Sequence, residues 1–195
     1  APPALRRAAK AARAGKAPGV IRAGDWLGEP VARAATPLWV WGAGHVGRAV
    51  VRAFDGLPFA VTWIDDAAER FPGAPPGPAA VRVAPRLAAA AEEAPAGAAH
   101  LVMTYSHALD LEIAHAVLRS GRFGRLGVIG SATKAARFRA RLGALGHSEA
   151  AVARMEMPIG LRGPAGLLGG KAPAEIAVAV AADHLGWRAR RGGAA

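Results

Sequence analysis

Residues 37–48, PLWVWGAGHVGR, join a short apolar run to a glycine-rich turn. The run Leu38–Trp41 has the length and composition of a buried parallel strand. After the turn, apolar residues recur at helical spacing, at Val46, Val50, Val51 and Phe54. A G-x-G-x-x-G loop between a strand and a helix is the setting in which such loops bind a phosphate. The stretch therefore predicts the first strand, loop and helix of a Rossmann-type sheet.

Each glycine of this loop has its own physical purpose. Gly42 permits the tight turn, Gly44 lets a phosphate approach the backbone, and Gly47 lets the helix pack against the strand. The free N–H groups and the positive dipole at the helix start favour an anion. His45 lies inside the loop, where its ring can donate to a phosphate or remain a solvent-facing side chain. We assign all four residues to a cofactor-binding site.

An acidic residue follows the second predicted strand, Phe59–Ile64. Asp65 lies 18 residues beyond Gly47, where a ribose-binding carboxylate is expected in a dinucleotide fold. We therefore expect Asp65 to bind ribose or another hydroxyl group. The alternative is that Asp65 or Asp66 caps the next turn.

Strands and helices alternate through the rest of the chain. Further short strands are predicted at residues 81–83, 101–104 and 126–129, and helices at 85–94, 107–120, 131–142, 148–155 and 173–185. This order predicts an α/β fold, a Rossmann-like, doubly wound and mostly parallel sheet of about five strands. Residues 37–187 form this domain. Residues 1–36, with a short helix over 2–14, are expected to be a connector or the remnant of an amino-terminal domain, and residues 188–195 a flexible tail.

Polar residues follow the strand predicted at 101–104. Ligands of open α/β sheets bind outside the carboxyl ends of the strands, so Ser106, His107 and Asp110 are candidate cofactor-binding residues. Capping of the next helix explains Ser106 and Asp110 without a ligand, but it does not explain His107. His107, Asp110 and His115 do not make a complete metal-ligand set, and we predict no metal site.

A second group of polar residues follows the strand predicted at 126–129. Gly130, Ser131, Thr133 and Lys134 offer a helix start, two hydroxyls and a positive charge to an anion, although an ordinary capped helix with a solvated lysine accounts for them too. Lys171, in a glycine-rich segment before the last predicted helix, is a further candidate for cofactor binding.

Composition narrows the classes of partner. The net charge of +11 favours an anionic ligand. Aromatic residues do not interleave with the basic ones as in a base-stacking surface, so nucleic acid is an unlikely partner. No long apolar run predicts a membrane span, and the absence of cysteine is compatible with the cytoplasm, where we place the protein.

The motifs, taken together and in this order, resemble the XdhC/CoxI family of xanthine dehydrogenase accessory proteins. The resemblance covers about residues 37–185 and rests on WGAGHVGR (41–48), VTWIDD (61–66), MTYSHALDL (103–111), GVIGSATK (127–134), PIGL (158–161) and GKAPAEIAVAVAA (170–182). Many members have a cysteine just before the Pro-Ile-Gly turn, where this chain has Met157.

The resemblance implies a maturation factor rather than an enzyme. Such a factor binds the molybdenum cofactor (molybdopterin, a phosphorylated pyranopterin) and assists its insertion into an apo molybdenum hydroxylase of the xanthine dehydrogenase type. Its other implied partner is a cysteine desulfurase, and a homodimer is compatible with the sequence. The loop chemistry identifies only a phosphate, so two alternatives stay open: an NAD(P)-dependent oxidoreductase, with His107 and Lys134 as proton donors, or a nucleotide-sensing Rossmann module.

Overall fold

A computed structural model describes residues 2–13, 20–29, 35–163, 166–167 and 170–192 of the chain. The chain divides into two compact units, Ala1–Ala35 and Thr36–Ala195. The larger unit contains the glycine-rich loop and all the residues that the sequence assigns to a site.

The smaller unit has more structure than a connector. Its helix α1 (Pro3–Arg13) lies where the sequence predicts it. Residues within the expected connector form an antiparallel hairpin of β1 (Ile21–Ala23) and β2 (Trp26–Gly28). The turn between them uses Gly24 with φ of +60°, a conformation that glycine adopts without strain. Three-residue strands are too short to show the alternation by which a strand is recognised in sequence.

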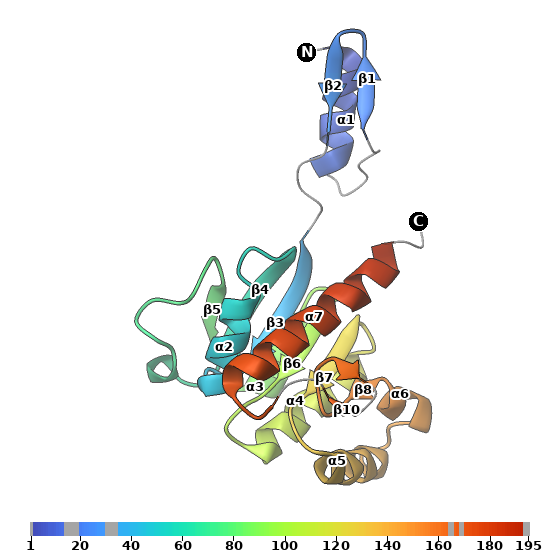
Figure 1. The fold of residues 1–195 in the computed structure, drawn as a ribbon. Helices are drawn as coiled ribbons and strands as arrows, with labels where there is room; N and C mark the ends of the chain where they lie inside the picture. Colours follow the sequence, from blue (N-terminus) through green and yellow to red (C-terminus); the bar gives the residue numbers. More distant parts are fainter. Residues whose placement is uncertain (1, 14–19, 30–34, 164–165, 168–169, 193–195) are drawn as a thin grey trace. The chain divides into compact units, whose positions relative to one another are not determined.

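The larger unit is built on a six-stranded parallel sheet (Figure 1). Its strands are β3 (Thr36–Trp41), β4 (Phe59–Asp65), β5 (Ala80–Val83), β6 (Ala99–Val102), β7 (Arg125–Val128) and β8 (Met155–Glu156), in the spatial order β5-β4-β3-β6-β7-β8. Every neighbouring pair is parallel. Numbered from β3, this is the order 3-2-1-4-5-6 of a doubly wound fold, whose direction of winding reverses between β3 and β6. The predicted α/β Rossmann-like class is confirmed.

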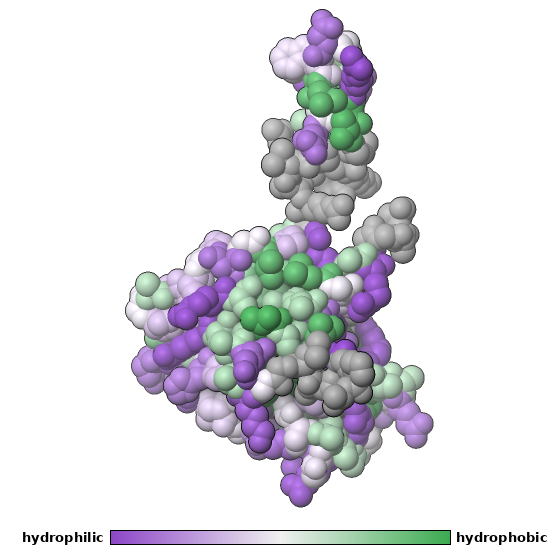
Figure 2. Space-filling model, in the orientation of Figure 1, coloured by the Kyte–Doolittle hydropathy of each residue, from purple (hydrophilic) through white to green (hydrophobic). Residues whose placement is uncertain are grey.

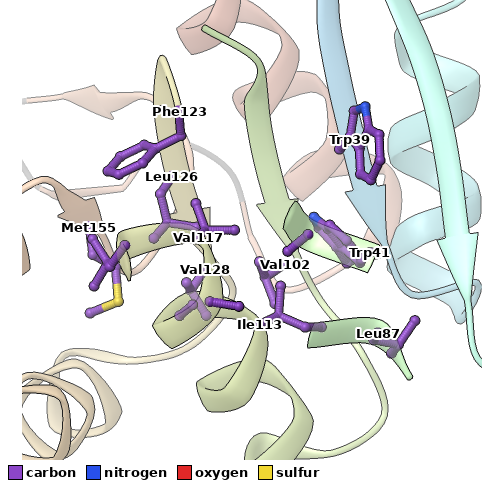
Figure 3. Packing of buried hydrophobic residues seen from close by; sticks show 14 of the residues in the cluster. Trp39, Trp41, Leu87, Val102, Ile113, Val117, Phe123, Leu126, Val128 and Met155 are labelled. Carbon is purple, nitrogen blue, oxygen red and sulfur yellow. The ribbon is translucent and has the colours of Figure 1, made fainter. Parts of the chain in front are cut away.

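Helices cover both faces of this sheet, and strand β3 shows how the sequence divides between them. Leu38 and Val40 point to the face covered by α2 (His45–Ala53) and α7 (Pro173–Gly192). Trp39 and Trp41 point to the opposite face (Figure 3). That face is covered by α3 (Leu87–Ala90), α4 (His107–Ser120) and α5 (Ala132–Ala144). Short elements fill the connections: 3₁₀ turns at Ala68–Arg70 and Ala91–Glu93, α6 (Glu149–Ala153), β9 (Arg162–Gly163) and β10 (Gly166–Leu167). A strand buried on both sides reads as a continuous apolar run for this reason.

Two differences from the expected boundaries change an element, while other ends are shifted by only one or two residues. The helix predicted at 148–155 ends at Ala153, and Met155–Glu156 then adds a sixth strand to the five that the sequence indicates. Helix α7 runs to Gly192, so residues 188–192 are helical rather than part of a flexible tail, while 193–195 lie outside the described residues. A two-residue strand carries no periodic signal, and the arginine-rich end of α7 has no apolar face by which the sequence could extend it.

The outer side of α7 is partly apolar. Val178 is 66% exposed and Leu185 is 37% exposed, and Figure 2 shows a hydrophobic area over this helix. No helix in the described part of the chain is long and apolar enough to cross a membrane.

Two histidines are buried in the core of the larger unit. His100, on β6, is stacked against Trp41 and accepts a hydrogen bond from its indole N–H at Nδ1 (3.2 Å). His184, on α7, packs among aromatic rings and has its Nδ1 2.9 Å from the carbonyl oxygen of Val180. Burial lowers the pKa of His100 to about 4 and that of His184 to about 3. Both rings are therefore neutral in the folded protein at pH 7.

These two rings make the fold sensitive to acid. In the unfolded chain a histidine has a pKa of about 6.5, so below that pH the unfolded state binds protons that the folded state does not. The free energy of unfolding then falls as the pH is lowered, by about 1.4 kcal/mol per pH unit for each histidine. The fall ends when the pH reaches the pKa of that histidine in the folded protein. Urea unfolding at pH 7 and pH 5 measures this slope. In His100→Gln, whose amide oxygen can accept the Trp41 bond but does not titrate, we expect roughly half the slope; an unchanged slope contradicts the assignment.

Candidate functional site

The glycine-rich loop is held by close backbone contacts at the carboxyl ends of three strands. Gly42 has φ of +110°, and a Cβ atom there would overlap the carbonyl group of Met103 on the neighbouring chain segment after β6. Its N–H donates to the Ile64 carbonyl (2.8 Å), and its carbonyl accepts the indole N–H of Trp63 (3.0 Å). At Gly47 a Cβ would overlap the Gly42 carbonyl oxygen. Gly42 and Gly47 are therefore required by packing, as the motif predicts.

Gly44 is different because nothing lies within 4 Å of the place where its Cβ would be. It is the N-cap residue of α2, which has no side-chain cap and no acidic residue in its first turn. The first N–H groups of a helix need acceptors from outside the helix, and an anion is a suitable one. The open side of Gly44 and the uncapped helix start leave room for such an acceptor.

A pocket of about 360 Å³ opens at this loop. It spans the point between β3 and β6 where the strand order reverses, the usual ligand position in doubly wound sheets. Its walls come from the loop and α2, from the end of β4 and the turn after it, and from the ends of β6 and β7: Ala43, Gly44, His45, Val46, Arg48, Asp65, Arg70, Met103, Thr104, Tyr105 and Ile129. Of the residues assigned from sequence, Gly44, His45 and Asp65 line it directly.

Asp65 is engaged with the loop itself. Its carboxylate is 2% exposed and accepts the N–H of Ala43 at Oδ2 (2.5 Å) and that of Asp66 at Oδ1 (2.7 Å). Arg70 lies 3.2 Å from Oδ1. Burial raises the pKa of Asp65, and the two backbone bonds act in the opposite direction. The carboxylate thus anchors the glycine-rich turn, a role that the ribose prediction did not include.

A polar rim, formed by Asp66, Arg70 and Tyr105, lies beside Asp65. The Tyr105 hydroxyl donates to Asp66 Oδ2 (2.8 Å), and the Arg70 guanidinium lies 3.8 Å from the centre of the Tyr105 ring. Burial opposes ionisation of Asp66, but its hydrogen bonds with Asp65 and Tyr105 and the charge of Arg70 lower its pKa overall. The rim connects the ends of β4 and β6 across the loop.

Arg70 and Tyr105 are site residues that the sequence assignment missed, as is Arg48. Arg48 donates to the carbonyl oxygens of Ala43 (3.0 Å) and Arg70 (2.7 Å), so it ties the loop to the turn after β4. Tyr105 is the sole tyrosine of the sequence and directly follows a predicted strand end, which was a usable signal. Arg48 ends the quoted stretch WGAGHVGR, whereas no sequence pattern distinguishes Arg70 from the other arginines.

Asp110, His107 and Lys134 come together outside the walls of this pocket. Asp110 is 1% exposed and accepts both the N–H (2.9 Å) and the hydroxyl (2.7 Å) of Thr104 at Oδ1. Burial raises the pKa of Asp110, and the Thr104 bonds oppose that shift. His107 Nδ1 lies 3.7 Å from Asp110 Oδ2, and its Nε2 lies 2.6 Å from Lys134 Nζ. The structure thus joins residues from two of the predicted strand ends.

The remaining predicted residues have mainly structural surroundings. Ser131 caps α5 by accepting the Lys134 N–H (3.3 Å), and Thr133 and Lys171 are exposed. Ser106 precedes α4 but makes no side-chain cap. Gly130 faces Met157, which is 3% exposed and packed in the core. None of these residues lines the pocket.

The structure does not support a metal cluster in the region it describes. No group of three or more His, Asp or Glu side chains among the described residues is arranged to hold an ion. His115 instead pairs with His147, with Nδ1 and Nε2 2.8 Å apart.

The two kinds of loop glycine predict opposite outcomes of substitution. Gly44→Val fills open space at φ of −72°, so we expect its melting temperature to stay within a few degrees of the wild type. Gly42→Ala places a Cβ against backbone at positive φ and should cost about 1–3 kcal/mol. Thermal unfolding of the two variants measures the difference. Equal losses in both would contradict the assignment of Gly44 to ligand space.

Asp65→Asn tests whether this residue anchors the loop. An amide has one acceptor oxygen, so its NH₂ group must face a backbone donor, and we expect a loss of about 1.5–3 kcal/mol in unfolding free energy. The ribose interpretation instead predicts normal stability and weaker binding of ribose-containing ligands only. Urea unfolding of Asp65→Asn beside the wild type separates the two.

Comparisons with known proteins agree with this geometry. The chain is similar to a crystal structure described as a xanthine dehydrogenase from Bacillus halodurans, with a TM-score of 0.62 and 20% identity over 85% of this chain and 45% of that chain. At this identity the likeness supports the fold, and the chain spans less than half of that protein's length. No curated protein is matched. A family model described as the XdhC Rossmann domain matches residues 38–184, and the chain therefore belongs to the XdhC family.

Proposed function

We propose that this chain binds the molybdenum cofactor at the Gly42–Gly47 loop and assists its insertion into a molybdenum hydroxylase of the xanthine dehydrogenase type. The observation that carries the proposal is the pocket at the strand-order reversal, which contains an uncapped helix start and a glycine with open space beside it. Membership of the XdhC family supports this choice of cargo and of acceptor enzyme.

The donor set fits the phosphate of this cofactor. Three features favour an anion at the loop: the N–H groups at the start of α2, the absence of an acid in its first turn, and His45 in the pocket wall. The Asp65 carboxylate is turned into the backbone behind the loop, so its charge is partly balanced by Arg70 and by two N–H donors. A phosphate can therefore approach Gly44 without meeting an unpaired carboxylate.

The opposite wall of the pocket suits a flat, polar ring system. Met103, Thr104, Tyr105 and Ile129 offer apolar surface with hydroxyl groups at its edge. Binding sites of cofactors commonly combine an apolar wall with a few polar groups in this way. A volume of about 360 Å³ suits a compact ligand held by one phosphate.

The chain lacks the groups that a sulfur-transfer step needs. It contains no cysteine, and Met157 is buried rather than presented to the pocket. We therefore assign sulfuration of the cofactor to a separate cysteine desulfurase, and to this chain the binding and presentation of the cofactor in the cytoplasm. In this proposal the chain acts as an accessory protein.

The strand order favours one alternative, because the order 3-2-1-4-5-6 with a glycine loop after its first strand is also that of dinucleotide-binding domains. An NAD(P)-dependent oxidoreductase or nucleotide sensor would need a hydroxyl-binding carboxylate at the end of β4. Asp65, the residue in that position, already accepts two backbone N–H bonds. This engagement favours the pterin over the dinucleotide.

Release of bound pterin tests the proposal. The chain is purified from a host that makes the molybdenum cofactor, oxidised, and assayed for pterin by fluorescence and mass spectrometry. We expect near-stoichiometric pterin from the wild type and at least tenfold less from Gly44→Val, whose side chain occupies the phosphate position. The matched control is Gly73→Val, at a glycine where a Cβ also meets open space but which lies outside the pocket. Bound NAD(P) with no pterin would contradict the proposal and support the dinucleotide alternative.

A further inference from the structure

Three side chains form a connected chain beside the proposed pocket. Asp110 holds Thr104 with one carboxylate oxygen, and its other oxygen, Oδ2, is buried and has no hydrogen-bond partner. The atom opposite Oδ2 is Nδ1 of His107, at 3.7 Å. A buried carboxylate oxygen without a partner is costly, so a polar group directed at it is the natural complement.

The contact between His107 and Lys134 determines which ring nitrogen carries the proton. The separation of 2.6 Å between Lys134 Nζ and His107 Nε2 is that of a hydrogen bond. A lysine ammonium has donors and no acceptor, and lysine holds its proton far more strongly than histidine, so Nε2 must accept. A neutral imidazole then carries its hydrogen on Nδ1, which faces Asp110 Oδ2. The Lys134 contact thus sets the tautomer of His107, and Asp110 Oδ2 lies 3.7 Å from the ring nitrogen that carries the hydrogen.

The charge of Lys134 lacks a carboxylate partner in the described structure. No ion pair of Lys134 occurs among the described residues, and its ammonium contacts the His107 ring. Lys134 lies in the first turn of α5, which contains no acidic residue, and His107 is the first residue of α4. The N-terminus of a helix carries partial positive charge, so a cation there is destabilising in the absence of an anion.

We infer that Lys134, placed by its contact with His107, forms a second anion-binding point, which holds an anionic oxygen of the ligand at the end remote from its loop phosphate. The inference rests on the proposed function for the identity of that ligand, but not for the existence of the subsite. The loop follows β3, whereas His107 and Lys134 follow β6 and β7, the next two strands. Neighbouring strands are about 4.8 Å apart, so the ends of β3 and β7 are separated by roughly 10 Å. The ligand then carries a second acidic group remote from its loop phosphate.

Inorganic phosphate is the probe for this subsite. It is titrated into the full chain carrying Gly44→Val, in which the loop is blocked, while the ring nitrogens of His107 are followed by ¹⁵N NMR. We expect a saturable shift of the Nε2 signal, because phosphate replaces or joins the ring as an acceptor of the Lys134 ammonium. In a Lys134→Met background the apparent affinity should fall at least tenfold. Arg139→Met, which removes an exposed cation from the same helix, is the matched control and should leave it unchanged.

The outcomes separate this inference from the proposed function. A phosphate response that Lys134→Met abolishes, in a protein that releases no pterin, keeps the subsite and contradicts the cofactor proposal. Normal pterin release from Lys134→Met, together with a His107 signal that ignores phosphate, contradicts the subsite and leaves the cofactor proposal intact. A phosphate shift of equal size in Lys134→Met also overturns the subsite, because the anion would then be bound elsewhere.

Discussion

The contact of the Gly42 backbone with its neighbours is the constraint on which the rest of the larger unit depends. The Gly42 carbonyl accepts the Trp63 indole N–H, and the Gly42 N–H donates to Ile64, so the turn is fastened to the end of β4. Its Cα lies so close to the Met103 carbonyl that no side chain fits between them. Three strand ends are thereby held together at one place. Helix α2 begins there because Gly47 can approach the carbonyl of Gly42.

The polar groups around this place divide into those that hold the loop and those that remain available to a ligand. Asp65 and Arg48 belong to the first kind, because their hydrogen bonds go to backbone groups of the loop and of the turn after β4. The N–H groups at the start of α2, together with His45, belong to the second. A buried carboxylate with two backbone donors fixes geometry, whereas an uncapped helix start is satisfied only by water or by a ligand.

The same division between holding and available groups is seen at the ends of β6 and β7, among Asp110, His107 and Lys134. Asp110 is buried and turned toward backbone and ring, and Lys134 carries the charge at the surface. The net positive charge of the whole chain is therefore also seen locally, because cationic or donor groups lie where three helices, α2, α4 and α5, begin. Helix dipoles add to these groups, and acids are absent from the first turns of α2 and α5.

The sequence alone determined the fold class, the loop, and the start of α5 with its Ser131 cap, because each depends on residues near one another along the chain. Periodicity marked five strands, but not β8, whose two residues gain their pairing from β7. The task of Asp65 was decided only by tertiary structure, since its partner Ala43 lies 22 residues away. The same holds for Tyr105 on Asp66, at a separation of 39 residues, and for Lys134 on His107, at 27. The physical reason is that a hydrogen bond between strand ends depends on the order and spacing of strands in the sheet, which no local pattern of residues encodes.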